Sequence, residues 1–283
     1  MTTLTSPAPT TPTRTPTATG RVTFARTTAA EWVKFRTVRS TVWTLVATVG
    51  LMVGISVLAA WGSTTVDLGT PEAMNTAQLL SAGYQLGQLA VAVLGVLTIT
   101  GEYSTGMVRS TLAAVPRRLP VLAAKALVVM VVVLVVSTVA MALSYVATMP
   151  FHDELNATFD LSQAETLRMT VGLPLYLAAI ALFAFAVGAL LRHSAAALTA
   201  VIALLLVVEN VLTLIPLQFI QNISPFLPST AGRRILFDDQ MLADVDAITS
   251  GAHLTPWQGY GVLVGWVLLL LALAAVLLRR RDA

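Results

Sequence analysis

The chain has 283 residues, of which 56% are hydrophobic and only 11% are charged. This composition excludes an ordinary soluble globular domain. The formal net charge of +3 is expected to lie in loops beside anionic lipid headgroups, so we expect no nucleic-acid partner. Cysteine is absent, which excludes disulfides and thiol chemistry.

Six apolar stretches, each of about 20 residues or more, have the length that a helix needs to cross a bilayer. In chain order they cover residues 42–61, 79–100, 120–149, 173–191, 195–215 and 259–278. Only helices pair every backbone group within such a segment. The sequence therefore predicts an all-α polytopic membrane protein with six transmembrane helices.

The distribution of basic residues predicts the orientation. Fourteen of the seventeen lysines and arginines fall before the first span, after the second, between the fourth and fifth, or after the last. The other three are Arg168, Arg233 and Arg234, and most acidic residues lie with them. We expect a multi-pass protein of the cell (plasma) membrane with both termini in the cytoplasm.

The region before the first span is expected to have two parts. Residues 1–28 are rich in Thr and Pro and predict a disordered cytoplasmic tail without a cleavable signal peptide, followed by a permease domain at 29–283. Residues 29–40 place Trp32, Phe35 and Val38 at three-residue steps among charged residues. This pattern predicts an interfacial helix, and an ordinary basic flank is the alternative.

Polar residues recur along one face of the second span. Ser81, Tyr84 and Gln88 follow one another at steps of three and four residues, and Gln85, next to Tyr84, fits the same pattern. Such a stripe must face protein or water. It is a candidate for the translocation pathway or for interhelical hydrogen bonding, which is the commoner case.

Glycine pairs at four-residue spacing are candidate helix-packing sites, because the motif lets two backbones approach closely. The pairs are Gly50/Gly54, Gly83/Gly87 and Gly261/Gly265.

The segment between the second and third spans carries a distinctive order of residues. Glu102 and Tyr103 come first, then Gly106 and Arg109, then Pro116, Arg117 and Arg118, and finally Lys125 at the start of the third span. We expect a compact helix on the cytoplasmic surface that Pro116 ends. Glu102 is expected to pair with a basic group on a soluble partner or on the interfacial helix.

This order resembles the signature region of bacterial type-two ATP-binding-cassette (ABC-2) transporter permeases. The run 227–231 (Leu-Pro-Ser-Thr-Ala) resembles a second family feature, and the likeness covers about residues 29–280. Gly106-Met107 departs from the usual Gly-Thr. The resemblance implies an exporter in which residues 102–118 couple to a separate ATPase subunit, with Glu102, Tyr103, Gly106, Arg109, Pro116, Arg117 and Arg118 as the coupling residues. It also implies a second permease copy, as a homodimer or a heterodimer.

The chain itself lacks a nucleotide site. Its lysines, Lys34 and Lys125, follow Val33 and Ala124, so neither can belong to a P-loop. ATP and Mg²⁺ are therefore expected on the partner ATPase, and we expect neither a cofactor nor a metal in this chain. The scattered histidines form no HExxH pair, and no acid–base cluster predicts an enzyme.

The fifth span contains Glu209 and Asn210. A carboxylate within a span is costly and is a functional candidate. Because Pro216 follows six residues later, Glu209 is expected in the outer half of the membrane, where it would either serve function or be hydrogen-bonded between helices.

The outward segment 216–258 is too long for a simple turn. Residues 228–236 predict a short extracellular helix capped by Ser229 or Thr230.

Two alternative functions stay open. An ion-coupled secondary transporter predicts inverted repeats and several charges at mid-membrane depth. A non-transporting membrane regulatory subunit is the other alternative.

Overall fold

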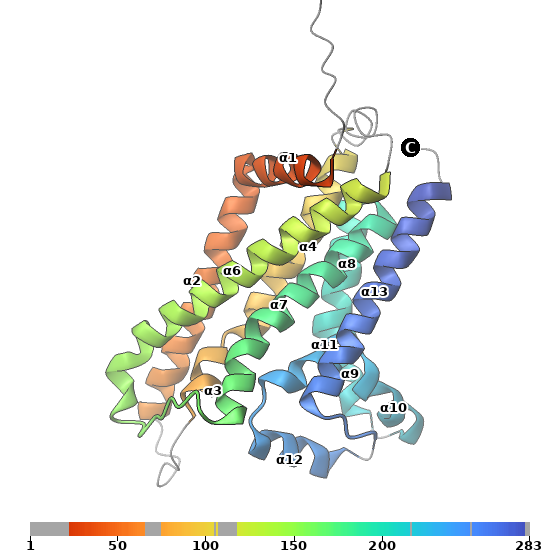
Figure 1. Ribbon diagram of the computed structural model, residues 1–283. Helices are drawn as coiled ribbons and strands as arrows, with labels where there is room; N and C mark the ends of the chain where they lie inside the picture. Colours follow the sequence, from red (N-terminus) through yellow and green to blue (C-terminus); the bar gives the residue numbers. More distant parts are fainter. Residues whose placement is uncertain are drawn as a thin grey trace, which may run out of the picture.

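The computed structural model describes residues 23–65, 75–104, 106, 118–215, 217–249 and 251–280. Within these ranges the chain is helical, and six helices are long and apolar enough to span a membrane (Figure 1). Their bounds are Arg39–Thr65, Thr76–Tyr103, Leu119–His152, Ala164–Leu191, Ser194–Leu212 and Pro256–Arg280. The predicted all-α fold with six spans is confirmed, and the chain is a multi-pass membrane protein.

Helix α1 (Phe24–Thr37) confirms the expected helix before the first span. The Thr23 side chain caps it by accepting a hydrogen bond from the Arg26 N–H. The chain turns at Val38, whose backbone is extended, and enters α2 (Arg39–Thr65). Figure 1 shows α1 lying across one end of the bundle, which we call the α1 end. Because α1 begins at Phe24, residues 24–28 belong to this helix and not to a tail, whereas residues 1–22 lie outside the described residues.

The centre of the bundle is α7 (Ala164–Leu191). Of the residues in its most apolar 18-residue stretch, 78% are buried, against 17% in the corresponding stretch of α2. Helix α7 packs on α4 (Tyr84–Ser104), α6 (Arg118–His152) and α13 (Pro256–Arg280). The approach of α4 to α7 is close. A Cβ atom added at Gly95 would lie 2.2 Å from the Ala181 carbonyl oxygen, so only glycine fits there.

One of the three glycine pairs packs helices together within the chain. A Cβ at Gly83 would lie 2.6 Å from the Met52 Cα, and one at Gly87 would lie 3.1 Å from the Met52 side chain. These contacts join α2 to the start of α4, which follows the short helix α3 (Thr76–Ser81). The other two pairs are open, because added Cβ atoms at Gly50, Gly54, Gly261 and Gly265 meet no described atom within 4 Å.

The fifth span is interrupted. It consists of α8 (Ser194–Ile202), the π-helical turn η1 (Ala203–Val208) and α9 (Glu209–Leu214). A left-handed residue, Arg192 (φ 55°), makes the tight link from α7. π-Helical turns are rare in proteins, and those that occur are often found at functional sites. This one directly precedes Glu209.

The segment between α9 and α13 folds into short helices. They are α10 (Gln218–Ile223), η2 (Ser224–Phe226), α11 (Pro228–Gly232), η3 (Arg233–Leu236) and α12 (Asp239–Ile248). The expected short helix exists as α11, most of whose residues are buried. It packs against α13, and its Ser229 contacts Tyr176 of α7. Its predicted cap was wrong, because Leu227 occupies the N-cap position with Pro228 as the first helical residue. Proline suits that position because it has no N–H to satisfy.

Candidate functional site

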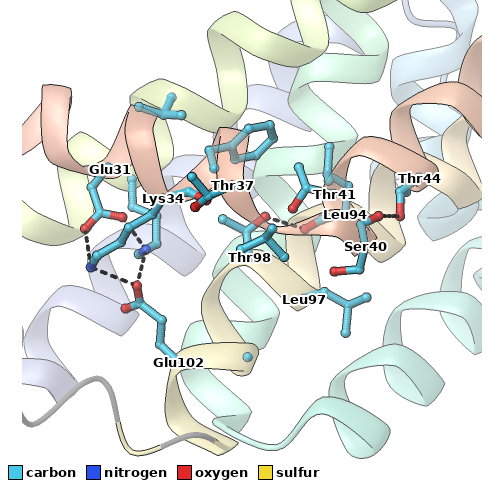
Figure 2. Close-up of a pocket in the computed structure, with 15 residues that line it drawn as sticks. Glu31, Lys34, Thr37, Ser40, Thr41, Thr44, Leu94, Leu97, Thr98 and Glu102 are labelled. Atoms are coloured by element: carbon cyan, nitrogen blue, oxygen red, sulfur yellow. Dashed lines mark hydrogen bonds and ion pairs between the residues drawn. The ribbon is translucent and has the colours of Figure 1, made fainter.

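Four charged side chains from three helices meet at the α1 end. Glu31 and Lys34 come from α1, Glu102 from the last turn of α4, and Lys125 from α6. We call these four residues the ion cluster. The Lys34 Nζ lies 3.1 Å from both Glu31 Oε1 and Glu102 Oε1 (Figure 2). The Lys125 Nζ lies 2.8 Å from Glu102 Oε1 and also pairs with Glu31 Oε2.

The ion cluster is largely shielded from solvent. The side chains of Glu31 and Lys125 are 4% and 5% exposed, whereas those of Glu102 and Lys34 are 13% and 31% exposed. Charges can be buried at acceptable cost only when they are paired, and here two carboxylates balance two ammonium groups. Burial acts to lower the pKa of Lys34, but the carboxylates of Glu102 and Glu31 outweigh it and raise the pKa above its ordinary value.

The ion cluster ties α1 to two spans. Glu102 was expected to pair with a basic group on a partner or on the interfacial helix, and the structure pairs it with Lys34 of α1. The pairing of Glu31 with Lys125 was not predicted. One signal was present, because a lysine about 10 Å into an apolar helix requires a buried counter-ion.

The neighbouring coupling candidates lie at the end of α4. The Arg192 guanidinium lies 5.4 Å from the centre of the Tyr103 ring, a cation–π contact that joins α4 to the α7–α8 link. Gly106 has a φ of +71°, a conformation that favours glycine. Arg118 begins α6. The rest of the expected coupling helix, with Arg109, Pro116 and Arg117, lies outside the described residues.

A second polar cluster is centred on Glu209, which is only 2% exposed. Its carboxylate accepts hydrogen bonds from the backbone N–H groups of Ser229 (3.0 Å) and Thr230 and from the Thr230 hydroxyl (2.8 Å). Glu209 therefore supplies, from another helix, the acceptor that the N-cap residue Leu227 cannot provide to α11. These are hydrogen bonds between helices, as one of the two alternatives for Glu209 expected, and its role in function stays a prediction.

The polar stripe of the second span reaches the same cluster. Gln88 is 1% exposed and accepts a hydrogen bond from the Tyr176 hydroxyl of α7. The Ser229 Oγ lies 2.9 Å from that hydroxyl and 3.4 Å from Gln88 Oε1. The structure therefore brings Gln88 and Glu209 together through Ser229, and hydrogen bonding across helices is confirmed for Gln88. We call Gln88, Tyr176, Glu209, Ser229 and Thr230 the Glu209 cluster.

Two other predicted residues lie apart from these bonds. Gln85 is half-buried on α4. Asn210 donates its amide to the Leu206 carbonyl of its own span at 2.8 Å. Tyr176, by contrast, was not expected at the site. Its sequence neighbours are apolar, and only its position opposite Gln88 shows its role.

In both clusters, ion pairs or hydrogen bonds join groups from different helices. Among the described residues, no group of three or more His, Asp or Glu side chains could hold a metal ion. The carboxylates of both clusters are already engaged with partners. No protein-family model and no curated protein matches this sequence.

Proposed function

We propose that this chain is the membrane-spanning permease subunit of an ATP-binding-cassette exporter, which couples ATP hydrolysis by a separate ATPase subunit to translocation of a substrate. The order of residues from Glu102 to Lys125 supports this proposal, together with six spans in one chain. The single observation that carries it is the position of Glu102 within the ion cluster.

Glu102 lies in the last turn of α4, three residues before the segment 105–117. In the proposed mechanism, the ATPase contacts that segment and displaces it when it closes on ATP. Glu102 then moves with the end of α4. Its bonds to Lys34 and Lys125 carry the displacement to α1 and α6, because ion pairs in a poorly solvated environment resist separation.

The displacement would reach the opposite half of the bundle through α7. This helix packs against both α4 and α6, and its Tyr176 belongs to the Glu209 cluster. In the proposed cycle, a shift of α4 against α7 alters the Gln88–Tyr176 contact and loosens α11 from Glu209. The Glu209 cluster is thus the outer element that responds to the ion cluster.

The proposed assembly contains two permease copies and two ATPase subunits. ATP and Mg²⁺ bind to the ATPase, the α1 end faces the cytoplasm, and the complex lies in the plasma membrane. The bias of basic residues toward the loops of that end supports this orientation.

The test is affinity purification of the chain from its own cells in mild detergent, with identification of partners that carry a P-loop. We expect a co-purified ATPase whose activity the wild-type permease stimulates. Glu102→Lys should abolish this stimulation, and Glu102→Gln should reduce it, while both variants remain in the membrane. The matched control is Asp160→Lys, an exposed carboxylate far from the ion cluster, which should behave as wild type.

Two results would overturn the proposal. One is full stimulation of a co-purified ATPase by Glu102→Lys. The other is substrate accumulation by the purified chain alone in vesicles with an ion gradient, which would establish the secondary transporter instead.

A further inference from the structure

A cavity of about 520 Å³ lies between α1, the first turns of α2, the last turns of α4, and α6 (Figure 2). Its volume falls within the range of about 300–1,000 Å³ that is typical of small-molecule sites. The ion cluster forms one end of the wall. The rest of the wall is made mainly by apolar groups and by threonines of α2 and α4.

The cavity changes from polar to apolar along α4. Glu102 and Gly101 line it at the α1 end, and Leu97 and Leu94 line it farther along the helix. Glu102 and Leu94 are eight residues apart, about 12 Å along a helix. The cavity therefore extends from the level of α1 into the membrane-spanning part of the bundle.

The hydroxyl groups of Thr44 and Thr98, in the inner part of the cavity, need no hydrogen bond from a ligand. The Thr44 hydroxyl donates to the Ser40 carbonyl at 2.8 Å, and the Thr98 hydroxyl donates to the Leu94 carbonyl at 2.7 Å. Because these hydroxyls are satisfied within their own helices, an apolar chain can lie against them without leaving a donor unpaired.

The mouth of the cavity is at the corner between α1 and α2. The lining residues Thr37, Val38 and Ser40 are exposed there. Two exposed arginines, Arg36 and Arg39, alternate with them in the sequence. Since the ion cluster is neutral overall, these arginines make the corner basic, at the level where an interfacial helix meets lipid headgroups.

We propose that this cavity binds one phospholipid from the membrane leaflet at the α1 end. Its phosphate lies at the basic corner beside Lys34, and one acyl chain extends between α2 and α4 along Leu97 and Leu94. The dimensions, the gradient of polarity and the basic corner all match such an amphiphile. The site goes beyond the proposed function, because lipid binding here depends on neither an ATPase nor transport.

Native mass spectrometry of the purified chain tests the site. The chain is reconstituted in vesicles of phosphatidylcholine and phosphatidylglycerol, then extracted and washed in mild detergent. Wild-type chain should retain one phospholipid. Thr98→Phe and Thr44→Phe fill the cavity from α4 and α2, and each should lower the retained fraction at least tenfold. Val46→Phe is the matched control, because Val46 is 55% exposed on α2 and does not line the cavity, so retention should stay at the wild-type value. Equal retention by all variants, or none by wild type, would overturn the proposal.

A second measurement needs no variant. A phospholipid with a photoreactive diazirine halfway along one acyl chain should label the α4 segment around Leu94 and Leu97 in a saturable manner. Glycerol phosphate, which has the phosphate but no chain, should not displace it at equal concentration. Displacement by glycerol phosphate would show a free-phosphate site, and labelling confined to exposed residues such as Val46 would show bulk lipid only. Either result would refute the lipid site.

Discussion

Glu31 and Lys125 form a buried ion pair although 94 residues separate them in the sequence. The pair joins α1, which lies across the end of the bundle, to α6, which spans it (Figure 1). Glu102 bonds to the same lysine from α4. The position of α1 is therefore tied to the ends of two spans.

Removal of Lys125 should be strongly destabilising. Lys125→Met leaves Glu31 and Glu102 with only Lys34 as a cation in the cluster. Loss of one partner of a buried pair typically costs about 3–5 kcal/mol. Unfolding of the purified chain in mixed detergent micelles measures the free energy. Arg36→Met on the exposed face of α1 is the control, and an equal, small effect of both variants would contradict the prediction. The double variant Glu31→Gln, Lys125→Met should lose less than the sum of the two single changes, because it removes the pair together.

Glu209 should stabilise α11 through its hydrogen bonds. Glu209→Ala leaves the N–H groups of Ser229 and Thr230 without their acceptor, and each unpaired buried group costs about 1–3 kcal/mol. Glu209→Gln keeps one acceptor oxygen and should lose less. Amide hydrogen exchange of residues 229–232 should speed up in the order wild type, Glu209→Gln, Glu209→Ala. Asn210→Ala is the control and should exchange as slowly as wild type. If Asn210→Ala exchanges as fast as Glu209→Ala, the effect is not specific to the Glu209 carboxylate.

The close approach of α4 and α7 should not tolerate a methyl group. Gly95→Ala places a Cβ 2.2 Å from the Ala181 carbonyl oxygen, which is backbone and cannot move aside easily. Overpacking of this kind typically costs about 1–3 kcal/mol. The methyl group added by Gly54→Ala in α2 meets no described atom within 4 Å, so this change should be neutral or slightly stabilising, because alanine favours the helix. The apparent melting temperature in detergent compares the two, and a lower value for Gly54→Ala than for Gly95→Ala would refute the packing.

Acid should weaken the contacts of α12 with Arg234 of η3 and with His253 in the loop before α13. Burial acts to raise the pKa of Asp246, but hydrogen bonds from His253 and Arg234 outweigh it and hold the pKa below its ordinary value. A lowered pKa in the folded state means that the contribution is complete above the ordinary pKa of about 4 and is lost as the pH falls below it. Hydrogen exchange of residues 239–249, corrected for the intrinsic rate, should therefore become faster below about pH 4. Asp246→Asn should remove this pH dependence of the exchange rate. If the pH dependence persists in that variant, it arises from another titratable group.

The two ends of the bundle should differ in access from outside the cell. The sequence contains no cysteine, so single cysteines report their own positions. Asp160→Cys, at an exposed position before α7, should react with an impermeant thiol reagent in intact cells. Arg36→Cys, exposed on α1, should react only after the membrane is permeabilised. The opposite pattern would reverse the proposed orientation, and labelling of both positions in intact cells would contradict six spans.

The six spans could be predicted because length and apolarity are local properties. Any segment with that many apolar residues must pair its own backbone in a membrane, whatever surrounds it. The helix before the first span was predictable for a similar reason, since Trp32 and Phe35 recur among charges. The polar spacing from Tyr84 to Gln88 likewise showed that this face of α4 needs polar neighbours.

Only the tertiary structure decided which partners those residues have. Glu31 meets Lys125, and Gln88 meets Tyr176, because of how each helix is rotated and packed against the next. The burial of α11 depends on the same packing, since Gly259 lets α13 approach the Ala231 carbonyl. A Ser-Thr pair beside proline predicts a helix start, and a cap was expected from those hydroxyls. Glu209 supplies the acceptor instead, because the fold places a carboxylate from the fifth span where the first N–H groups of α11 point.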